Sequence, residues 1–324
     1  GLHPEGRGAR RCRSRRIAWL MAPRPSSGLN GYLVIDKPAG WTSFDVVARA
    51  RRLLGERKVG HAGTLDPAAT GVLPLAVGSA TKTLEYLSGA SKAYLAEIVF
   101  GIETDSYDID GRVTRVGDPS AVTAERITTV LASLLGDQTQ IPPMHSAVKI
   151  GGQRLYDLAR RGEEIERAPR PVTFHRLDLH AWEPPVATIW VDCSKGTYIR
   201  TLAKDLGDAL GCGAHLGNLV RYRTGPFHLC EAWTMTDLAD SALPEAWPEI
   251  AVHPDTVILD LPALILDPDE SRAWRQGKTI AAEQVVAGDC RAYAEDGEWL
   301  GIGRAEPDGR GWHPEKVVAA GSPA

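Results

Sequence analysis

The sequence predicts a mixed α+β fold with a mainly antiparallel sheet, followed by a small β-rich C-terminal part. Strand-like and helix-like segments are mixed without the regular rhythm of βαβ units, which argues against a parallel sheet. The 324 residues suffice for about two domains, and a hydrophobic content of 43% suffices for a sizeable core. A Pro- and Ala-rich connection over residues 240–256 then precedes a final segment of short strands with one helix.

The first elements are predicted from alternation, helical periodicity and capping. Thr42 and Asp45 have the spacing of a capping box, which predicts that a helix begins there and continues to Leu54. The run 72–77 is short and apolar, as in a buried strand. In chain order we expect a strand over 32–36, the helix to Leu54, a strand over 72–77, a short helix over 82–87, a strand over 92–102 and an acidic turn over 104–111.

The later elements surround a proline-rich segment. Residues 141–170 hold a strand-like run over 146–150 and a helical run over 156–161 between prolines, and we expect them to form a projecting arm. Around this arm we expect a helix over 123–135 that stops at Gly136, strands over 171–182 and 186–194, a helix over 197–210, strands over 216–223 and 226–230, and a helix over 270–276.

These elements predict three parts: a basic N-terminal extension over 1–28, a main domain over 29–255 that carries the arm, and a C-terminal domain over 256–324. Residues 1–20 contain six arginines and no methionine. We interpret Met21 as the natural start, with residues 1–20 as upstream or artificially added sequence. A basic arm that binds RNA is the alternative.

Composition excludes several classes of protein. No apolar run reaches the roughly 18 residues that a membrane helix needs. The formal net charge of −4 argues against a general polyanion binder, although a local basic groove is possible, for example around the cluster 49–58. The five cysteines contain no Cys-x-x-Cys pair and no zinc set. We interpret all five as free thiols in a reducing cytoplasm.

The most informative segment is the loop 60–71, which contains three glycines, His61 and a single carboxylate, Asp66. A glycine-rich loop beside a buried strand can present a reactive side chain from a rigid scaffold. An isolated Asp-Pro pair is more often a helix start, in which the carboxylate caps free N–H groups. The loop alone does not decide between these interpretations.

Two further segments carry candidate functional side chains. Residues 195–201 turn at a glycine from a strand into a helix that begins with Tyr198 and Arg200, and arginine suits a partly buried pair with a carboxylate. A surface ion pair is the alternative. Tyr94 opens a strand, where it either packs in the core or offers a stacking platform for a flat ring. No dinucleotide fingerprint, phosphate loop or nucleophile elbow predicts a cofactor or a serine nucleophile.

Taken together, these segments resemble the TruB family of bacterial tRNA pseudouridine-55 synthases. The loop 60–71 has the family's form Gly-His-x-Gly-x-Leu-Asp-Pro-x-Ala-x-Gly. The order and spacing of motifs hold from about residue 30 to residue 230. The further matching segments are 36–43, Lys82, 92–94, 104–111, 142–149, 195–200 and 215–221.

The resemblance implies that a uridine in the T loop of tRNA is isomerised to pseudouridine without a cofactor or a metal. The uridine must be flipped out of the folded RNA, at a cost of a few kcal/mol. Asp66 would be the catalytic carboxylate that attacks C1′ or C6 or abstracts a ribose proton. Arg200 would pair with Asp66 and keep it ionised, and Tyr94 would stack on the uracil and take the C5 proton.

The resemblance also implies residues and domains that bind the RNA. His61 would help displace the base, Tyr198 and Leu219 would line the pocket, and four lysines would contact phosphates. The segment 141–170 would be an RNA-binding insertion, and 256–324 a PUA-like RNA-binding domain. We expect a cytoplasmic monomer that binds the T stem-loop of tRNA, without a membrane or an obligate protein partner. The expected substrate-binding residues are His61, Gly63, Thr64, Tyr198, Leu219, Lys37, Lys82, Lys149 and Lys195.

Two other classes of function stay open on the sequence. A non-catalytic RNA-binding or tRNA-folding protein would keep a basic groove and would not need Asp66. A carboxylate glycosidase would need two carboxylates about 5–10 Å apart, and only Asp66 lies in a distinctive motif.

Overall fold

The computed structural model describes residues 29–144, 149–150, 153–154, 165–241, 245–282 and 285–318. The expectations for residues 1–28 and for most of the arm, including its helix over 156–161, lie outside these ranges. Within them, no helix is both long and apolar enough to cross a membrane. The chain divides into two compact units. Among the described residues, the first comprises those from 29 to 67, from 72 to 88 and from 225 to 318, and the second comprises those from 68 to 71 and from 89 to 224.

The first unit begins with short strands and the predicted capped helix. The Thr42 hydroxyl accepts a hydrogen bond from the Asp45 backbone N–H at 3.1 Å, and the Asp45 carboxylate accepts one from the Thr42 backbone N–H at 2.8 Å. Strand β1 lies beside β3, which also pairs antiparallel with β2. The elements are β1 (Gly31–Lys37), α1 (Ser43–Leu54), β2 (Val59–His61), β3 (Thr70–Val77), η1 (Gly78–Thr83) and α2 (Leu84–Gly89).

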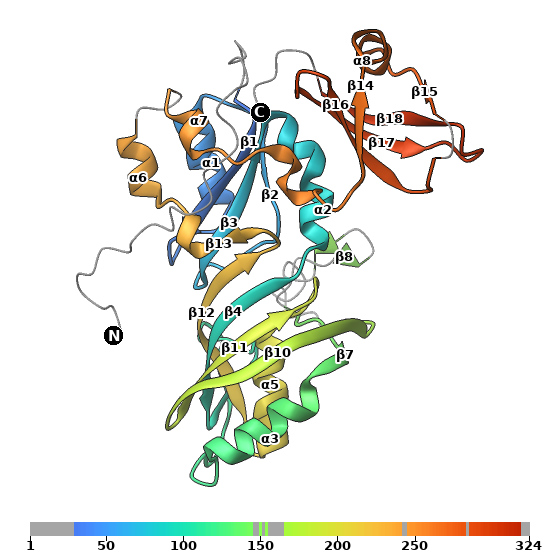
Figure 1. The fold of residues 1–324 in the computed structure, drawn as a ribbon. Helices are drawn as coiled ribbons and strands as arrows, with labels where there is room; N and C mark the ends of the chain where they lie inside the picture. The colour runs from blue at the N-terminus through green and yellow to red at the C-terminus, as the bar shows by residue number, and fades with distance from the viewer. Residues whose placement is uncertain are drawn as a thin grey trace. The chain divides into compact units, whose positions relative to one another are not determined.

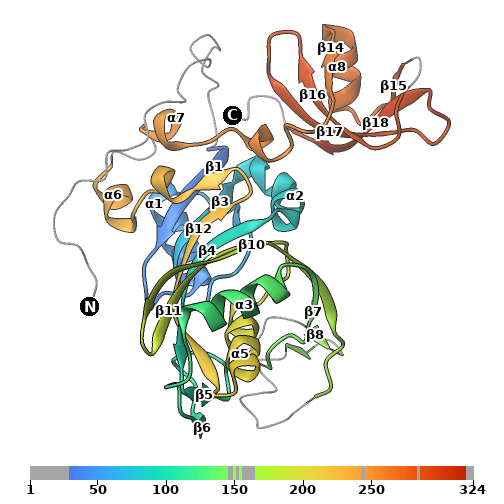
Figure 2. The same ribbon diagram turned by 60° about the horizontal axis from the view of Figure 1, so that its bottom comes forward.

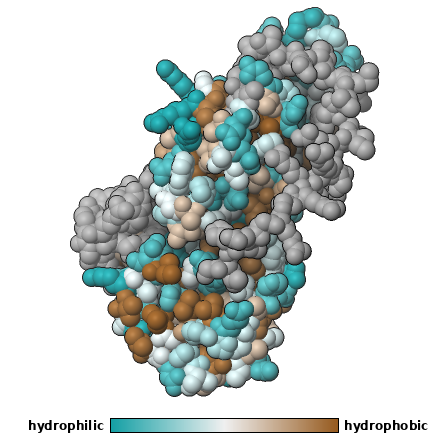
Figure 3. Space-filling view, turned by 90° about the vertical axis from the view of Figure 1, so that its left-hand side faces the viewer, coloured by the Kyte–Doolittle hydropathy of each residue, from teal (hydrophilic) through white to brown (hydrophobic). Residues whose placement is uncertain are grey.

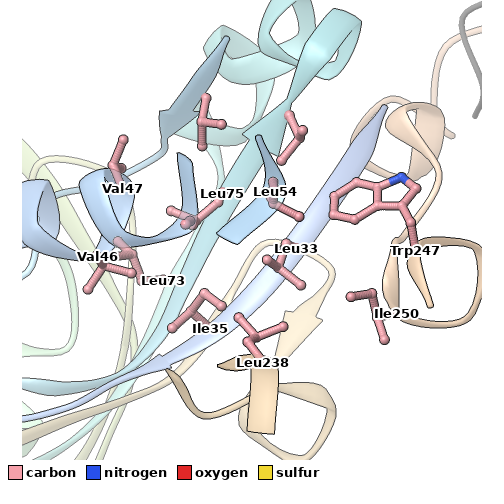
Figure 4. Packing of buried hydrophobic residues seen from close by; sticks show 13 residues of the cluster. Leu33, Ile35, Val46, Val47, Leu54, Leu73, Leu75, Leu238, Trp247 and Ile250 are labelled. Atoms are coloured by element: carbon pink, nitrogen blue, oxygen red, sulfur yellow. The ribbon is translucent and has the colours of Figure 1, made fainter. Parts of the chain in front are cut away.

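The core of the first unit combines residues from its early strands and helix with residues that follow Gly225. Leu33 and Ile35 from β1 pack with α1, β3 and the side chains of Trp247 and Ile250 (Figure 4). Trp247 is 3% exposed, and its indole N–H donates to the carbonyl of Asn30 at 3.0 Å. The elements here are β13 (Phe227–His228), η2 (Leu229–Glu231), α6 (Met235–Asp240), α7 (Trp247–Ile250) and η3 (Pro254–Val257).

The Pro- and Ala-rich connection over 240–256 also supplies core side chains, which its composition did not predict. Its Pro- and Ala-rich average hides two large apolar side chains, Trp247 and Ile250, that complete the core of the first unit. Burial of a tryptophan and an isoleucine contributes several kcal/mol, since each fully buried large apolar side chain is worth about 1.5–3 kcal/mol.

The C-terminal part contains a five-stranded sheet in the order β14-β16-β17-β18-β15 (Figure 1). Only the β14–β16 pair is parallel. Helix α8 begins at an Asp267 cap, and its Trp274 is fully buried in the core of this sheet. The elements are β14 (Ala263–Leu266), α8 (Pro268–Arg275), β15 (Ile280–Ala281), β16 (Asp289–Ala294), β17 (Trp299–Ala305) and β18 (Gly311–Val317).

The second unit is an antiparallel sheet with two helices. Strands β12, β4, β11, β10 and β7 are neighbours in this order, and α3 and α5 lie against the sheet (Figure 2). The elements are β4 (Lys92–Phe100), β5 (Ile102–Thr104), β6 (Val113–Val116), α3 (Ala124–Leu134), β7 (Gly136–Gln140), β8 (Lys149–Ile150), β9 (Gln153–Arg154), β10 (Arg170–Glu183), β11 (Val186–Cys193), α5 (Ile199–Leu210) and β12 (Ala214–Thr224).

The predicted fold class is confirmed: the described chain is a mixed α+β protein with mainly antiparallel sheets and a β-rich C-terminal part. Strand β7 was not expected, because its sequence Gly-Asp-Gln-Thr-Gln is polar and has no apolar alternation. Apolar side chains also reach the surface, and Figure 3 shows several that gather on the lower part of one face. In the second unit, Val113 and Val116 are 59% and 75% exposed, so both ends of the short β6 project apolar side chains into solvent.

Candidate active site

The loop 60–71 is held on both sides of Asp66 by the segment that precedes and begins α1. The Ser43 hydroxyl accepts from the Leu65 N–H at 3.0 Å and donates to the Leu65 carbonyl at 3.2 Å. On the other side, the Pro67 carbonyl accepts from the Gly40 N–H at 2.8 Å. Residues 66–69 are not helical, and β3 begins at Thr70, so the interpretation of Asp66 as a helix cap is wrong. The half-buried Asp66 lies between two anchored neighbours.

Lys37 is part of this support and has no exposed surface. Its ammonium donates to the carbonyls of Pro38 at 2.9 Å, Trp41 at 2.6 Å and Pro67 at 3.1 Å. An ammonium has three N–H donors, and these three carbonyls match that number. The placement contradicts the prediction that Lys37 contacts a phosphate, because the charged end points into the protein and fixes the loop instead.

One of the other loop candidates, His61, lies beside an exposed aromatic side chain. His61 is the last residue of β2 and is half-buried. The Phe44 ring, 68% exposed, meets the His61 ring edge-on with centroids 6.4 Å apart. Gly63 has φ +75°, a left-handed conformation that favours glycine, and Thr64 is exposed. His61 and Phe44 therefore form an aromatic edge beside the loop.

In the second unit, the predicted pocket residues Tyr94 and Leu219 share one face of the sheet. Tyr94 on β4 lies opposite Arg221 on β12, and Ala96 lies opposite Leu219. Because side chains two residues apart on a strand point to the same face, all four lie on that face. Tyr94 is 7% exposed, Leu219 is half-buried, and Arg221 is 1% exposed and hydrogen-bonded to the Tyr94 side chain.

Arg200 is buried at the start of α5, where it forms an ion pair with Asp108 at 3.4 Å. The other Asp108 oxygen accepts from the Ser106 hydroxyl at 2.6 Å and from the Asp110 N–H at 3.1 Å. Tyr107, which precedes Asp108, has φ +63°, a rare backbone conformation that costs about 1–3 kcal/mol. The acidic turn 104–111 thus aims one carboxylate at Arg200.

Asp108 was missed as a site residue. The signal that could have found it was the acidic turn itself, which matched the family in spacing but offered three carboxylates without a way to choose among them. The predicted pair between Asp66 and Arg200 joins the two units and stays a prediction.

The remaining candidates are distributed over both units. Tyr198 precedes α5, and its backbone N–H donates to the Gln140 side-chain oxygen at 2.9 Å. Lys195 is exposed. Lys82 is half-buried, and its ammonium donates to the Val317 carbonyl; burial, followed by repulsion from nearby lysines, lowers its pKa. The backbone of Lys149 lies in β8, and its side chain lies outside the described part of the structure.

No group of three or more His, Cys, Asp or Glu side chains suited to a metal ion occurs among the described residues. The cysteines at 193, 212, 230 and 290 are free thiols, as expected, and Cys12 lies outside the described ranges. Burial raises the pKa of the Cys193 thiol to about 11, so it is not a reactive thiolate near neutral pH.

Comparison with known proteins identifies the family. Residues 51–199 match the model described as the TruB family pseudouridylate synthase N-terminal domain. Residues 200–264 match the tRNA pseudouridylate synthase B C-terminal domain, and residues 262–315 match a further C-terminal model of pseudouridine synthase II TruB. The tRNA pseudouridine synthase B of Dehalococcoides mccartyi strain 195 is 43% identical over 296 residues, which cover 91% of this chain and 98% of that protein. The chain belongs to the TruB family.

Other relatives agree with this assignment. The tRNA pseudouridine synthase B of Aromatoleum aromaticum is 47% identical over 293 residues, 90% of this chain and 93% of that protein. That of Symbiobacterium thermophilum is 54% identical over 217 residues, 66% of this chain and 73% of that protein. Among solved structures, one chain of a Cbf5-Nop10-Gar1 complex has a TM-score of 0.68 and 26% identity, and covers 91% of this chain and 86% of that chain. The TruB-family fold therefore extends through most of the protein.

Proposed function

We propose that this TruB-family protein isomerises the T-loop uridine at position 55 of tRNA to pseudouridine. The observation that carries the proposal is the placement of Asp66. It lies in a non-helical loop between Leu65 and Pro67, whose backbone groups are anchored by residues 37–43. Because no helix begins at Asp66, helix capping does not account for this carboxylate, and a catalytic role does. The family membership and the relatives' names support the reaction and the substrate.

The chemistry needs one carboxylate and one base. Asp66 starts the reaction by attack at C1′ or C6 or by removal of a ribose proton, and the N1–C1′ bond breaks. The uracil turns, and a C5–C1′ bond forms while the hydrogen stays on C5. Any bond from Asp66 to C1′ or C6 breaks again before the product leaves, and an abstracted ribose proton returns to the ribose. Loss of that hydrogen as a proton restores the C5=C6 double bond, and N1 takes up a proton from water. Tyr94 stacks on the ring and accepts the C5 proton, and Leu219 and Tyr198 line the pocket.

Arg200 is the proposed positive partner of the catalytic carboxylate. In the proposed arrangement Arg200 pairs with Asp66 and favours its ionised form, because a nearby positive charge stabilises a carboxylate. The Asp108 pair fixes the direction of the guanidinium before the RNA binds. A planar guanidinium can bind two carboxylates at once, which a lysine ammonium does with less directional precision.

We propose that RNA binding uses local positive charge on a chain with a negative net charge. At the end of α1 and in the turn after it, Arg49, Arg52, Arg57 and Lys58 are exposed. We assign phosphate contacts to this group, to Lys82, Lys149 and Lys195, and to the segment 141–170. We keep the proposed domains 29–255 and 256–324, and we assign the C-terminal sheet as a PUA-like RNA-binding domain. The protein acts as a cytoplasmic monomer without an obligate partner.

The function is tested with a tRNA transcript that carries tritium at C5 of its uridines, in buffer with EDTA. Isomerisation of one uridine releases one equivalent of tritium per tRNA into water. A transcript with cytidine in place of the T-loop uridine is the matched control and should release none. Binding of both transcripts without tritium release would support the non-catalytic RNA-binding class and contradict the proposal.

A further inference from the structure

Arg221 is a buried cation to which the reaction described above gives no role. It lies on β12, is 1% exposed and is among the largest fully buried side chains of the protein. Transfer of a charged group out of water costs several kcal/mol after relaxation, so a buried guanidinium needs interactions that repay desolvation. Arg221 lies beside Tyr94, the predicted base of the reaction, so a role for the buried guanidinium is sought there.

The contact that matters is with Tyr94. Arg221 and Tyr94 are direct cross-strand partners in the β12–β4 ladder, on the same face of the sheet. The Arg221 side chain is hydrogen-bonded to the Tyr94 side chain, so the guanidinium donates to the phenol oxygen. Because guanidinium has donors and no acceptor, this contact favours the phenolate over the phenol.

The backbone of Arg221 is fixed to the end of the loop 60–71. Val220 and Arg221 pair in parallel with Thr70 and Gly71 of β3. Gly71 has φ +99°, and a Cβ there would lie 2.3 Å from the Arg221 carbonyl oxygen, so only glycine allows this approach. The backbone of Arg221 therefore contacts the last residue of the loop, and its side chain contacts Tyr94.

The local charge agrees with this arrangement. Lys92, two residues before Tyr94 on β4, is 8% exposed. Burial first, and then the positive charge of Arg221, lower the pKa of Lys92 to about 8. Lys92 and Arg221 are therefore two buried cations that repel each other, and both belong to the face of the sheet that carries Tyr94.

We infer that Arg221 is a positioning residue for the last proton transfer: it holds the Tyr94 oxygen in place and stabilises the phenolate that accepts the C5 proton. In that step the C5–H bond breaks and the proton moves to the Tyr94 oxygen. The electron pair forms the C5=C6 bond, and N1 takes a proton from water. Tyr94 then returns its proton to solvent. The inference rests on the proposed uridine isomerisation.

The test compares tRNA transcripts with hydrogen or deuterium at C5 of uridine, in single-turnover reactions with the full chain. Arg221→Gln should form pseudouridine at least about 30-fold more slowly than the wild type. Its hydrogen-to-deuterium rate ratio should rise above about 2, because C5 deprotonation becomes rate-limiting. The Kd for tRNA should change less than threefold. A slower reaction with the wild-type ratio would overturn the inference, since general structural damage does not select the C5–H step.

Two further variants test whether misfolding or the loss of any nearby positive charge could explain the result. Arg221→Lys keeps the charge and should show a smaller rate loss with a raised ratio, which is the deciding measurement if Arg221→Gln does not fold. Arg223→Gln is the matched control, because Arg223 lies two residues further on β12 and pairs with Asp192 at 2.8 Å. It should keep the wild-type ratio, and a raised ratio there would contradict a role specific to Arg221.

A double variant separates action through Tyr94 from independent action. In a Tyr94→Phe background, the change Arg221→Gln should cost less than about threefold, because its partner oxygen is already gone. Fully additive losses would contradict the inference. If the wild type itself forms no pseudouridine, the proposed function fails; if the wild type is active and the ratio does not change in the variants, only the role of Arg221 fails.

Discussion

The protein holds its candidate site residues in two different ways. In the first unit, the loop around Asp66 is held through its backbone: Ser43, Gly40 and Lys37 bind the peptide groups of Leu65 and Pro67, on both sides of Asp66. In the second unit, the side chains themselves are held. Tyr94 and Arg200 are positioned by Arg221 and Asp108, through a hydrogen bond and an ion pair.

This difference determines whether a substitution lowers activity alone or lowers stability as well. A loop fixed by its peptide groups can lose its functional side chain and keep its shape. A pair of buried, charged side chains cannot lose one member cheaply, because the other is left buried without its partner at a cost of about 3–5 kcal/mol when fully buried. Substitutions in the two regions should therefore separate chemistry from stability to different degrees.

The largest effect is expected for Asp66→Asn. Turnover should fall by about four orders of magnitude, since the amide cannot act as a carboxylate nucleophile or base. The loop should keep its shape, so the Kd for tRNA should stay within about tenfold, or roughly 1.4 kcal/mol. Tritium release and filter binding measure the two quantities. Retained turnover would falsify the assignment of Asp66 as the essential group.

The next effect is expected for Arg200→Met and Asp108→Asn. Each should reduce turnover by about 100-fold, and Arg200→Lys should not restore full activity because it lacks the planar fork. Unlike Asp66→Asn, Arg200→Met should also lower the free energy of unfolding, by about 2 kcal/mol, because Asp108 is only 20% exposed and loses its partner. Urea unfolding tests the contrast. An unchanged midpoint would mean that the pair does not stabilise the fold.

Lys37 and Lys82 offer a matched pair within the first unit. Lys37→Met should lower the free energy of unfolding by about 2 kcal/mol and slow turnover, because three carbonyls lose a charged donor. It should leave the salt dependence of tRNA binding unchanged. Lys82→Met should reduce the slope of log K against log salt by about one unit, as loss of one phosphate contact does. A reduced slope for Lys37→Met would restore the original phosphate prediction.

Lys92 gives a test that depends on pH. Its folded-state pKa of about 8 lies below the ordinary value of 10.5, so the unfolded chain binds more protons between these two values. The cost of the buried charge is complete below pH 8 and is lost by about pH 10.5. Lys92→Met should therefore be more stable than the wild type at pH 7, by about 3 kcal/mol. Thermal melts should show this advantage shrinking as the pH rises. An advantage independent of pH would contradict the pKa.

The smallest effect is expected for Ser43→Ala. Loss of the two hydrogen bonds to Leu65 should lower the free energy of unfolding by about 1 kcal/mol and reduce turnover a few-fold. Hydrogen exchange at the Leu65 amide should become faster than in the wild type. Exchange at an unchanged rate would show that Ser43 does not hold the loop, and that the loop and the second unit do not differ in the way described.

Most of the secondary structure was accessible from the sequence because its causes are local. The Thr42–Asp45 capping box lies within four residues, and the apolar run from Val72 and the alternation in β11 are read from near neighbours. The loop motif around Asp66 was equally visible, and so was its resemblance to the TruB family. The β7 strand and the packing of Trp247 were missed, because neither a polar edge strand nor one tryptophan in a Pro-rich stretch has a local signature.

The tertiary structure decided the roles of the charged residues. The sequence shows that Lys37, Asp108 and Arg221 are charged, and charged side chains are usually exposed. Each is instead turned inward by a partner far along the chain: Lys37 by the carbonyl of Pro67, Asp108 by Arg200, and Arg221 by Tyr94. The free energy of a buried charge depends on those partners and on lost contact with water. Only the folded chain brings the partners together and removes the water, so local sequence alone could not reveal these roles.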